Sequence, residues 1–216
     1  MEKENVIVYL ADISKTDYET LYASFKANME PKRVERIELA GNDKVKKELV
    51  ATGALLQGIL RGFGKKATDI AFEEKGKPYL PDCEDVYFNV SHSGNYVMIA
   101  FSGQPIGVDI QKIVPYKEAL VNRICSFDER SKYSGDLIRH LNKIWAVKEA
   151  YSKLTGEGIG KDLSEVSFEG ENDDLTISDK GEPSAKGKIV FSDDIYEAVV
   201  TAKEDFFVTA INRMNL

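Results

Sequence analysis

Two acidic residues that lie far apart in the sequence could share a divalent metal ion. Asp109 interrupts the apolar stretch PIGVDIQ (105–111), and Glu149 lies in WAVKEAYSKLTGEG (145–158). An aspartate on a strand and a glutamate on a helix together supply oxygen ligands for Mg²⁺, whose other positions waters and substrate phosphates fill. Two simpler explanations stay open. Asp109 could face water from an edge strand, and Glu149 could pair with Lys153 on a surface helix, which would stabilise that helix by about 0.2–0.5 kcal/mol.

The periods of the two elements place further residues beside these carboxylates. Gln111 follows Asp109 by two residues, so the period of a strand puts both on one face. In the helix, Lys148 falls within the apolar arc, whereas Glu149 and Lys153 lie on the opposite, exposed side. A buried ammonium needs a charged partner, because desolvation otherwise drives it neutral. The predicted buried arc consists of Leu137, Leu141, Ile144, Val147, Tyr151 and Leu154.

A second group of residues is suited to binding phosphate. His92 is one of only two histidines, and it stands between two serines in FNVSHSG (88–94). Hydroxyl and backbone donors converge in this predicted connector, as a phosphate contact requires. Lys77 stands on the predicted turn of GKPYLP (76–81). A structural role for His92 is the alternative.

Basic residues gather in two places on a chain whose net charge is −7. That charge argues against nucleic acid as the main partner. A solvated helix face would explain each basic run, but a basic patch on an acidic protein can also hold a phosphorylated small molecule. The first run comprises Lys32, Arg33, Arg36, Lys44, Lys46 and Lys47, and the second comprises Arg61, Lys65 and Lys66.

Length and composition predict a protein with a substantial core. The chain has 216 residues, of which 43% are hydrophobic, enough for one large domain or two small ones. No apolar run is long enough to span a membrane, and the start MEKENVIVYL does not resemble a signal peptide. Cys83 and Cys125 are too few for a disulfide framework, and no Cys/His cluster indicates zinc. We therefore expect a cytoplasmic protein.

The order of predicted elements indicates an α+β fold. A strand at 5–10 is followed by helices at 16–28, 31–39 and 43–61. The third helix has the strongest pattern, with apolar or small residues at helical spacing: Val45, Leu49, Thr52, Leu56 and Ile59. Strands are predicted at 87–91, 96–102 and 105–113, and helices resume from about Lys117 and at 137–155. The remainder is mostly strand, with an exposed loop and hairpin at 169–186. YEAVVTAK and FFVTAINRM are predicted to pair with each other through a connection at Glu204-Asp205.

Taken in order, GKPYL, FNVSHSG, PIGVDIQ and WAVKEAYSKLTGEGI resemble the motifs of the 4′-phosphopantetheinyl transferases, in particular the monomeric type that activates surfactin synthetase. The basic segment EPKRVERI is similar too, so the resemblance runs from about residue 29 to 160. It implies two similar α+β halves related by a pseudo-twofold, here 1–106 and 107–216, with coenzyme A in the cleft between them. It also implies Mg²⁺-dependent transfer of the phosphopantetheine arm to a serine of an acyl or peptidyl carrier protein, with release of adenosine 3′,5′-bisphosphate.

The resemblance also implies roles for individual residues. Asp109 and Glu149 correspond to the metal carboxylates, Glu149 also to the base for the serine, and Lys153 to a lysine at the pyrophosphate. Gln111 stands where the surfactin type has a glutamate, and we keep it as a candidate metal ligand. Further candidates are Ser91 and His92 for the nucleotide phosphates, Lys32, Lys47 and Lys77 for further coenzyme A contacts, and Glu129 for a position near the metal.

Two points temper the resemblance. Glu48 stands where the surfactin type has a small hydroxyl residue that contacts the ligand, which puts that contact in doubt. A catalytically silent coenzyme A-binding protein that docks carrier domains is the alternative function, although the intact set of Asp109, Glu149 and Lys153 weighs against it. The same co-occurrence of motifs weighs against a structural protein with ordinary surface charge.

Overall fold

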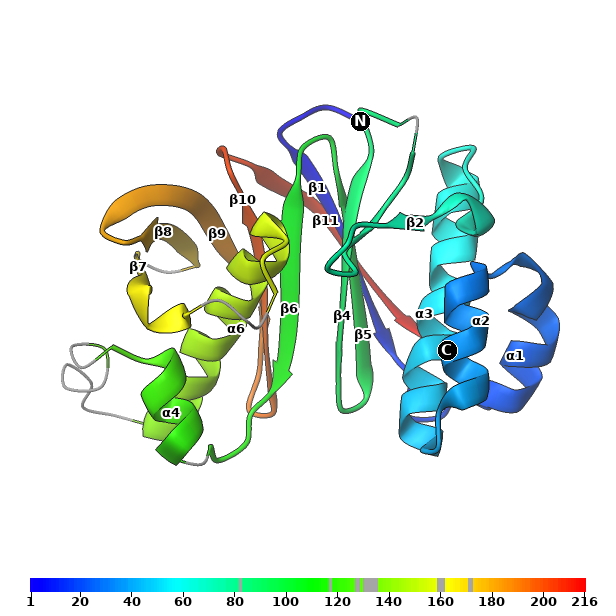
Figure 1. The fold of residues 1–216 in the computed structure, drawn as a ribbon, viewed down its shortest axis with the longest axis horizontal. Helices are drawn as coiled ribbons and strands as arrows, with labels where there is room; N and C mark the ends of the chain where they lie inside the picture. The colour runs from blue at the N-terminus through cyan, green and yellow to red at the C-terminus, as the bar shows by residue number, and fades with distance from the viewer. Residues whose placement is uncertain (82, 117, 127–128, 130–135, 159–161, 171–172) are drawn as a thin grey trace.

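Two β-sheets lie side by side at the centre of the molecule, each covered by helices on its outer side (Figure 1). A computed structural model describes residues 1–216 except 82, 117, 127–128, 130–135, 159–161 and 171–172. The first sheet has the order β11-β1-β5-β4 and the second the order β6-β10-β9-β8-β7. The predicted α+β class is confirmed.

The first half of the chain supplies most of the first sheet and its helical cover. Its elements are β1 (Asn5–Asp12), α1 (Tyr18–Phe25), the 3₁₀ turn Lys26–Asn28, α2 (Pro31–Leu39), α3 (Asp43–Gly62), the 3₁₀ turn Ala67–Asp69, β2 (Ala71–Phe72), β3 (Pro78–Tyr79), β4 (Tyr87–Ser93) and β5 (Tyr96–Ser102). The side chain of Asn42 caps α3 by accepting a hydrogen bond from the Lys44 amide. Leu56 and Leu60 of α3 are fully buried in a core shared with Phe101 of β5. The helices predicted here are confirmed, but Val45 is 41% exposed and does not belong to the buried face.

The second half of the chain supplies the second sheet. Its elements are β6 (Ile106–Lys112), α4 (Glu118–Ile124), α6 (Leu137–Thr155), the 3₁₀ turn Leu163–Glu165, β7 (Val166–Glu169), β8 (Asp174–Asp179), β9 (Glu182–Ser192), β10 (Tyr196–Ala202) and β11 (Phe207–Asn215). Val147 and Tyr151 of α6 are buried against β7–β10. Leu137 is 51% exposed, contrary to prediction, because it starts the helix one turn before the buried stretch that begins at Leu141. The predicted start of a helix at Lys117 lies outside the described residues.

The last strand joins the first sheet instead of pairing with its neighbour in sequence. β10 pairs with β6 and β9, whereas β11 pairs in parallel with β1. The predicted pairing of the last two strands is therefore wrong. With both sides of β10 occupied by other strands, β11 adds to the free edge of β1. One consequence is that residues 207–215 belong structurally with the sheet of the N-terminal half, although they fall in the predicted half 107–216.

The two sheets meet where β4 and β6, an edge strand of each, lie next to one another (Figure 1). Side chains of β4 accept hydrogen bonds from alternate amides of β6: Asn89 Oδ1 from Val108 at 3.1 Å, Ser91 Oγ from Ile110 at 3.3 Å, and Ser93 Oγ from Lys112 at 3.0 Å. These contacts satisfy the edge amides of β6 that a strand partner would otherwise bond. The alternation of polar side chains in YFNVSHS therefore fixes β4 against β6.

A glycine lets α6 approach β6 closely. A Cβ atom built on Gly107 would lie 2.0 Å from the carbonyl oxygen of Ala150 and 2.4 Å from the amide nitrogen of Leu154. Only a residue without a side chain permits backbone contact at this distance. The result is that Asp109, two residues further along β6, and Glu149, one residue before Ala150, belong to directly adjoining backbone segments.

Candidate active site

Three predicted site residues form one hydrogen-bonded cluster between β4, β6 and α6. The Ser91 hydroxyl donates to Asp109 Oδ1 at 2.8 Å. The Lys153 ammonium donates to the same oxygen at 2.6 Å and to Ser91 Oγ at 2.9 Å. Ser91 and Asp109 are 4% and 5% exposed, whereas the side chain of Lys153 is 28% exposed, so the ion pair is buried on the Asp109 side only. Asp109 is thus held by an ammonium and a hydroxyl and does not face water from a sheet edge.

Glu149 lies beside this cluster and is buried, contrary to the prediction that it faces solvent. Only 6% of the residue is exposed. Burial raises the pKa of the Glu149 carboxyl and the charge of Asp109 raises it further, whereas Lys153 and Arg123 act in the opposite direction. The helical period predicts one buried arc, but every residue of α6 from Ala146 to Ser152 is buried. A surface Glu149–Lys153 pair therefore does not describe this helix.

The two carboxylates each keep one buried oxygen without a partner. Among the residues that the structure describes, Asp109 Oδ2 and Glu149 Oε1 have no hydrogen-bond donor. An unsatisfied buried carboxylate oxygen is costly, and each exception calls for an explanation. Within the described residues no group of three or more His, Cys, Asp or Glu side chains forms a metal cluster. Two carboxylate oxygens nevertheless fit the donor set of Mg²⁺, which commonly takes one or two carboxylates and fills its other positions with waters and phosphates.

Glu129 has a protein partner, the buried ammonium of Lys148. Lys148 Nζ donates to Glu129 Oε2 at 2.8 Å and to the Ile124 carbonyl at 2.7 Å, and its side chain is 0% exposed. Burial lowers the pKa of Lys148, and the hydrogen bond and charge of Glu129 oppose that effect. The Ser126 amide also donates to Glu129 Oε2. The prediction that Lys148 is buried with a charged partner is confirmed, and the partner is the glutamate that we had placed near the metal.

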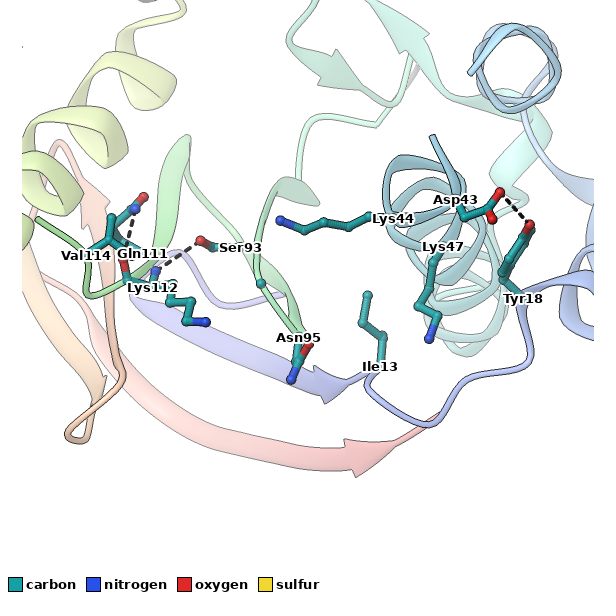
Figure 2. A pocket seen from close by; sticks show the side chains of 11 residues that line it. Ile13, Tyr18, Asp43, Lys44, Lys47, Ser93, Asn95, Gln111, Lys112 and Val114 are labelled. Atoms are coloured by element: carbon teal, nitrogen blue, oxygen red, sulfur yellow. Dashed lines mark hydrogen bonds between the residues drawn. The ribbon is translucent and has the colours of Figure 1, made fainter. Parts of the chain in front are cut away.

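A cavity of about 610 Å³ lies between the two halves of the chain, next to the cluster (Figure 2). α3 contributes Lys44 and Lys47, and Figure 2 shows Lys44 pointing toward Ser93 of β4. β6 contributes Gln111 and Lys112. Ser93 is two residues from Ser91, and Gln111 is two residues from Asp109, so the cavity begins about 7 Å along both strands from the cluster.

Gln111 and Lys47 line this cavity, but their polar groups are bonded to the backbone. Gln111 Nε2 donates to the Lys112 carbonyl at 3.1 Å, and the side chain points away from the cavity in Figure 2. Lys47 Nζ donates to the Ser14 carbonyl at 3.2 Å. Gln111 does share a strand with Asp109, as predicted. A role for Gln111 at a metal requires its amide to rotate, and remains a prediction.

His92 is paired with Glu48. Its Nδ1 lies 3.2 Å from Glu48 Oε2, and the Lys44 ammonium lies 3.8 Å from Glu48 Oε1. Burial raises the pKa of the Glu48 carboxyl, but the hydrogen bond and charge of His92, together with Lys44, outweigh it and leave the pKa below its ordinary value. The sequence predicts a connector at His92 and Ser93, but both residues belong to strand β4. The turn that follows contains Gly94, whose φ is 59°.

Lys77 and Lys32 lie apart from the cavity lined by Lys44 and Lys47. Lys77 stands on the predicted turn, between β2 and β3, and donates to the Leu154 carbonyl in the last turn of α6 at 2.7 Å. This contact satisfies a carbonyl that the helix end leaves unpaired. Lys77 also lines a cavity of about 200 Å³ together with Lys153. Lys32 lies over the ring of Phe72, with Nζ 4.5 Å from the ring centre.

Tyr116 is a residue near the carboxylates that the sequence analysis missed. Its hydroxyl is buried and has no hydrogen-bond partner within the described residues. Burial raises the pKa of Tyr116, and the charges of Asp109 and Glu149 raise it further. A single tyrosine after a strand carries no periodic signal, so the sequence could not have revealed it. The contacts of Asn89 and Ser93 were also missed, although their alternation with Ser91 was a readable signal.

Parts of the chain are similar to known proteins. Residues 105–205 match the model of the 4′-phosphopantetheinyl transferase superfamily, a range that includes Asp109, Glu149 and Lys153. The chain is 36% identical over 115 residues to 4′-phosphopantetheinyl transferase Sfp of Bacillus subtilis (strain 168), a match covering 50% of this chain and 51% of that protein. It is 29% identical over 155 residues to another 4′-phosphopantetheinyl transferase of Bacillus subtilis, covering 68% and 69%. With 4′-phosphopantetheinyl transferase psf-1 of Bacillus pumilus it shares 38% over 96 residues, covering 43% and 41%.

The fold and the site define an α+β protein with a buried carboxylate pair and adjoining lysines between two sheets. The likeness to the 4′-phosphopantetheinyl transferase superfamily lies in residues 105–205, the segment that holds Asp109, Glu149 and Lys153. It spans about half the length of the first Bacillus relatives that it matches, 51% of one and 47% of the next. None of the helices in the described part of the chain is both long and apolar enough to cross a membrane.

Proposed function

We propose that this protein transfers the 4′-phosphopantetheine arm of coenzyme A to a serine hydroxyl of an acyl or peptidyl carrier protein, with Mg²⁺ as cofactor. The observation that carries the proposal is the pair of unpartnered buried oxygens on Asp109 and Glu149 beside the Lys153 ammonium. Phosphoryl transfer depends mainly on positioning and on neutralising charge at in-line oxygens, and this arrangement offers groups for both.

Asp109 and Glu149 are the proposed metal ligands, and Gln111 and Glu129 are further candidates. When bound there, Mg²⁺ neutralises charge on the pyrophosphate oxygens of coenzyme A. Glu129 is the weaker of the two candidates, because Lys148 and the Ser126 amide already bond its Oε2. Its other oxygen, Oε1, is buried and has no partner among the described residues, so the carboxylate keeps one open position.

In the proposed reaction, Glu149 accepts the proton of the carrier serine as the serine oxygen attacks the phosphorus of the phosphopantetheine group. The new O–P bond forms as the bond to the bridging pyrophosphate oxygen breaks, and adenosine 3′,5′-bisphosphate leaves with that oxygen. Lys153 offsets the charge that develops on the leaving phosphate. A carboxyl whose pKa is raised by burial is a better proton acceptor than an exposed glutamate, which supports this role for Glu149.

The nucleotide end of coenzyme A is proposed to occupy the cavity of about 610 Å³. Lys44, Lys47 and Lys112, set against the single acid Asp43, give this cavity a net positive lining, which suits a ligand with three phosphates. Ser91 and His92 lie where β4 passes from the cluster to the cavity, and we assign them to the phosphates. Lys77 is proposed to contact the phosphate side through the neighbouring cavity that it shares with Lys153, and Lys32 stays a candidate at the adenine side.

The function is tested by incubating the protein with coenzyme A, Mg²⁺ and a panel of apo-carrier proteins, and by measuring the intact mass of each carrier. We expect a mass increase of one phosphopantetheine group on at least one carrier, and no increase when a chelator is in excess. Coenzyme A binding without any modified carrier would instead identify a non-catalytic coenzyme A-binding protein. Full turnover in excess chelator would contradict the metal assignment.

Replacing His92 with alanine is expected to weaken coenzyme A binding while leaving dephospho-coenzyme A nearly unaffected. Hydrogen bonds to charged groups contribute about 1.5–3 kcal/mol, so the loss for coenzyme A should be tenfold or more. Calorimetric titration of both ligands with both proteins measures the difference, and dephospho-coenzyme A serves as the internal control. Equal losses for the two ligands would show that His92 only positions Glu48 and the end of β4.

A further inference from the structure

The second basic cluster of the sequence, Arg61, Lys65 and Lys66, has no part in the proposed reaction. It lines a separate cavity of about 390 Å³ at the C-terminal end of α3. Gln57 of the same helix and Asn28 and Thr68 of the facing segments complete its polar lining. A cavity of this size can enclose a small phosphorylated molecule.

This cavity is distinct from the one beside the carboxylates. The two share no lining residue. Lys47 and Arg61 are 14 residues apart on one helix, which corresponds to about 21 Å at a rise of about 1.5 Å per residue. Figure 1 shows that the N-terminal end of α3 lies at the level of the β4–β5 turn and the C-terminal end at the opposite edge of the molecule. A ligand in the second cavity would therefore not touch Asp109 or Glu149.

The lining of this cavity offers hydrogen-bond donors in excess. No acidic side chain contributes to it among the described residues, and none of its three cations forms an ion pair within that part of the chain. The amide nitrogen of Gln57 is buried and has no acceptor among the described residues. Lys65 also acts on a nearby carboxyl: the pKa of Asp85 is lowered by its hydrogen bond from Cys83, by the N-terminus and, less strongly, by Lys65.

A helix C-terminus favours basic residues, but this preference does not explain the whole arrangement. The dipole of α3 accounts for a cation in its last turn, where Arg61 stands. It does not account for a buried donor on Gln57 that lacks an acceptor among the described residues, nor for the cavity that Gln57 lines. A buried amide without a partner costs free energy, and an anionic acceptor bound in the cavity would remove that cost.

We propose that this cavity is a second, independent binding site for the phosphate group of a small anionic molecule. Phosphate oxygens are acceptors only, so they complement Gln57 Nε2 and the three cations. The guanidinium of Arg61 presents several donors in a plane that matches a phosphate, and Lys66 adds a point charge. The site does not depend on the transfer reaction, because none of its residues contacts the carboxylate cluster.

The test is a titration of the ¹⁵N-labelled protein with inorganic phosphate, followed by nuclear magnetic resonance. We expect saturable shifts of the Gln57 side-chain amide and of backbone amides in residues 61–68. Arg61→Ala and Gln57→Leu should each weaken phosphate at this site about tenfold, since each removes one donor to an anion. Lys46→Ala is the matched control, because it removes one charge from the same helix but lines neither cavity, and it should change the affinity less than twofold.

Three outcomes would overturn the proposal. Shifts confined to residues around Lys47 and Ser93 would place phosphate only in the first cavity. Equal weakening by Lys46→Ala and Arg61→Ala would indicate general attraction to a basic surface. Unchanged phosphate affinity in Gln57→Leu would show that this side chain does not bind phosphate. Should that variant not fold, unchanged affinity in the exposed variant Lys66→Ala would contradict the proposed site instead. The readout involves neither coenzyme A nor a carrier, so failure of the transferase proposal leaves it intact.

Discussion

Glu149→Gln is expected to lower the rate of phosphopantetheine transfer by more than about 10²-fold while raising thermal stability at neutral pH. The amide keeps the size of the side chain but removes both the proposed metal charge and the proposed base, and general bases alone contribute about 10²–10⁴-fold. Turnover is measured from the intact mass of the carrier against time. Glu165→Gln is the control, since it neutralises an exposed glutamate that forms an ion pair with Lys180 at 3.8 Å and with no other described residue.

The gain in stability follows from the direction of the Glu149 pKa. Burial raises that pKa in the folded protein, so the unfolded chain loses this proton more readily. Below the ordinary pKa of glutamate, about 4.3, both states bind the proton and the burial cost is absent. As pH rises through the raised pKa, the folded protein must carry a buried charge and loses stability. The melting temperature of Glu149→Gln should therefore exceed that of the parent at pH 7, and the difference should shrink toward pH 4. A variant that is fully active, or less stable at pH 7, would contradict the assigned role.

Glu129→Ala is expected to destabilise the fold by about 3–5 kcal/mol, because it leaves the fully buried Lys148 ammonium without its anionic partner. The Ile124 carbonyl at 2.7 Å would remain as an acceptor, but a neutral oxygen does not replace the carboxylate. Urea denaturation at pH 7 measures the loss. The exposed pair Lys180–Glu165 offers the control, since Glu165→Ala should cost at most about 1 kcal/mol.

A double variant separates the structural role of Glu129 from a role at the metal. Lys148→Met combined with Glu129→Leu replaces the buried pair with apolar side chains, which commonly restores stability. If Glu129 serves only Lys148, the double variant should recover most of the lost stability and keep the Mg²⁺ dependence of the transfer rate. A stable double variant that needs much more Mg²⁺ for half-maximal rate would assign Glu129 to the metal as well.

Local patterns in the sequence were enough to locate the elements and the principal chemical groups. The period of 3.6 residues placed α3 and α6, and the period of two placed β4, β5 and β6, because these patterns depend only on residues near one another in the chain. Asp109 stood out because an aspartate is costly in an apolar strand. Lys148 stood out for the same reason in a helix, and the sequence required a partner for it without being able to name Glu129.

The tertiary structure decided what depends on partners distant in the sequence. Helical periodicity divides a helix into one buried and one exposed side, but every residue of α6 from Ala146 to Ser152 is buried, Glu149 included, which no local pattern reports. The parallel pairing of β11 with β1 depends on which sheet edge is free once β10 is enclosed.

The same distinction applies to the site. The sequence suggested Asp109 and Glu149 as carboxylate ligands of a metal ion, and the resemblance to a known family added Lys153. Only the fold showed that Gly107 lets α6 reach β6 and that Ser91 and Lys153 share one oxygen of Asp109. The other oxygen is buried and has no partner among the described residues. The residue types determine which chemical groups are present. The burial of these groups and their hydrogen-bond partners follow from how the two sheets and α6 pack together.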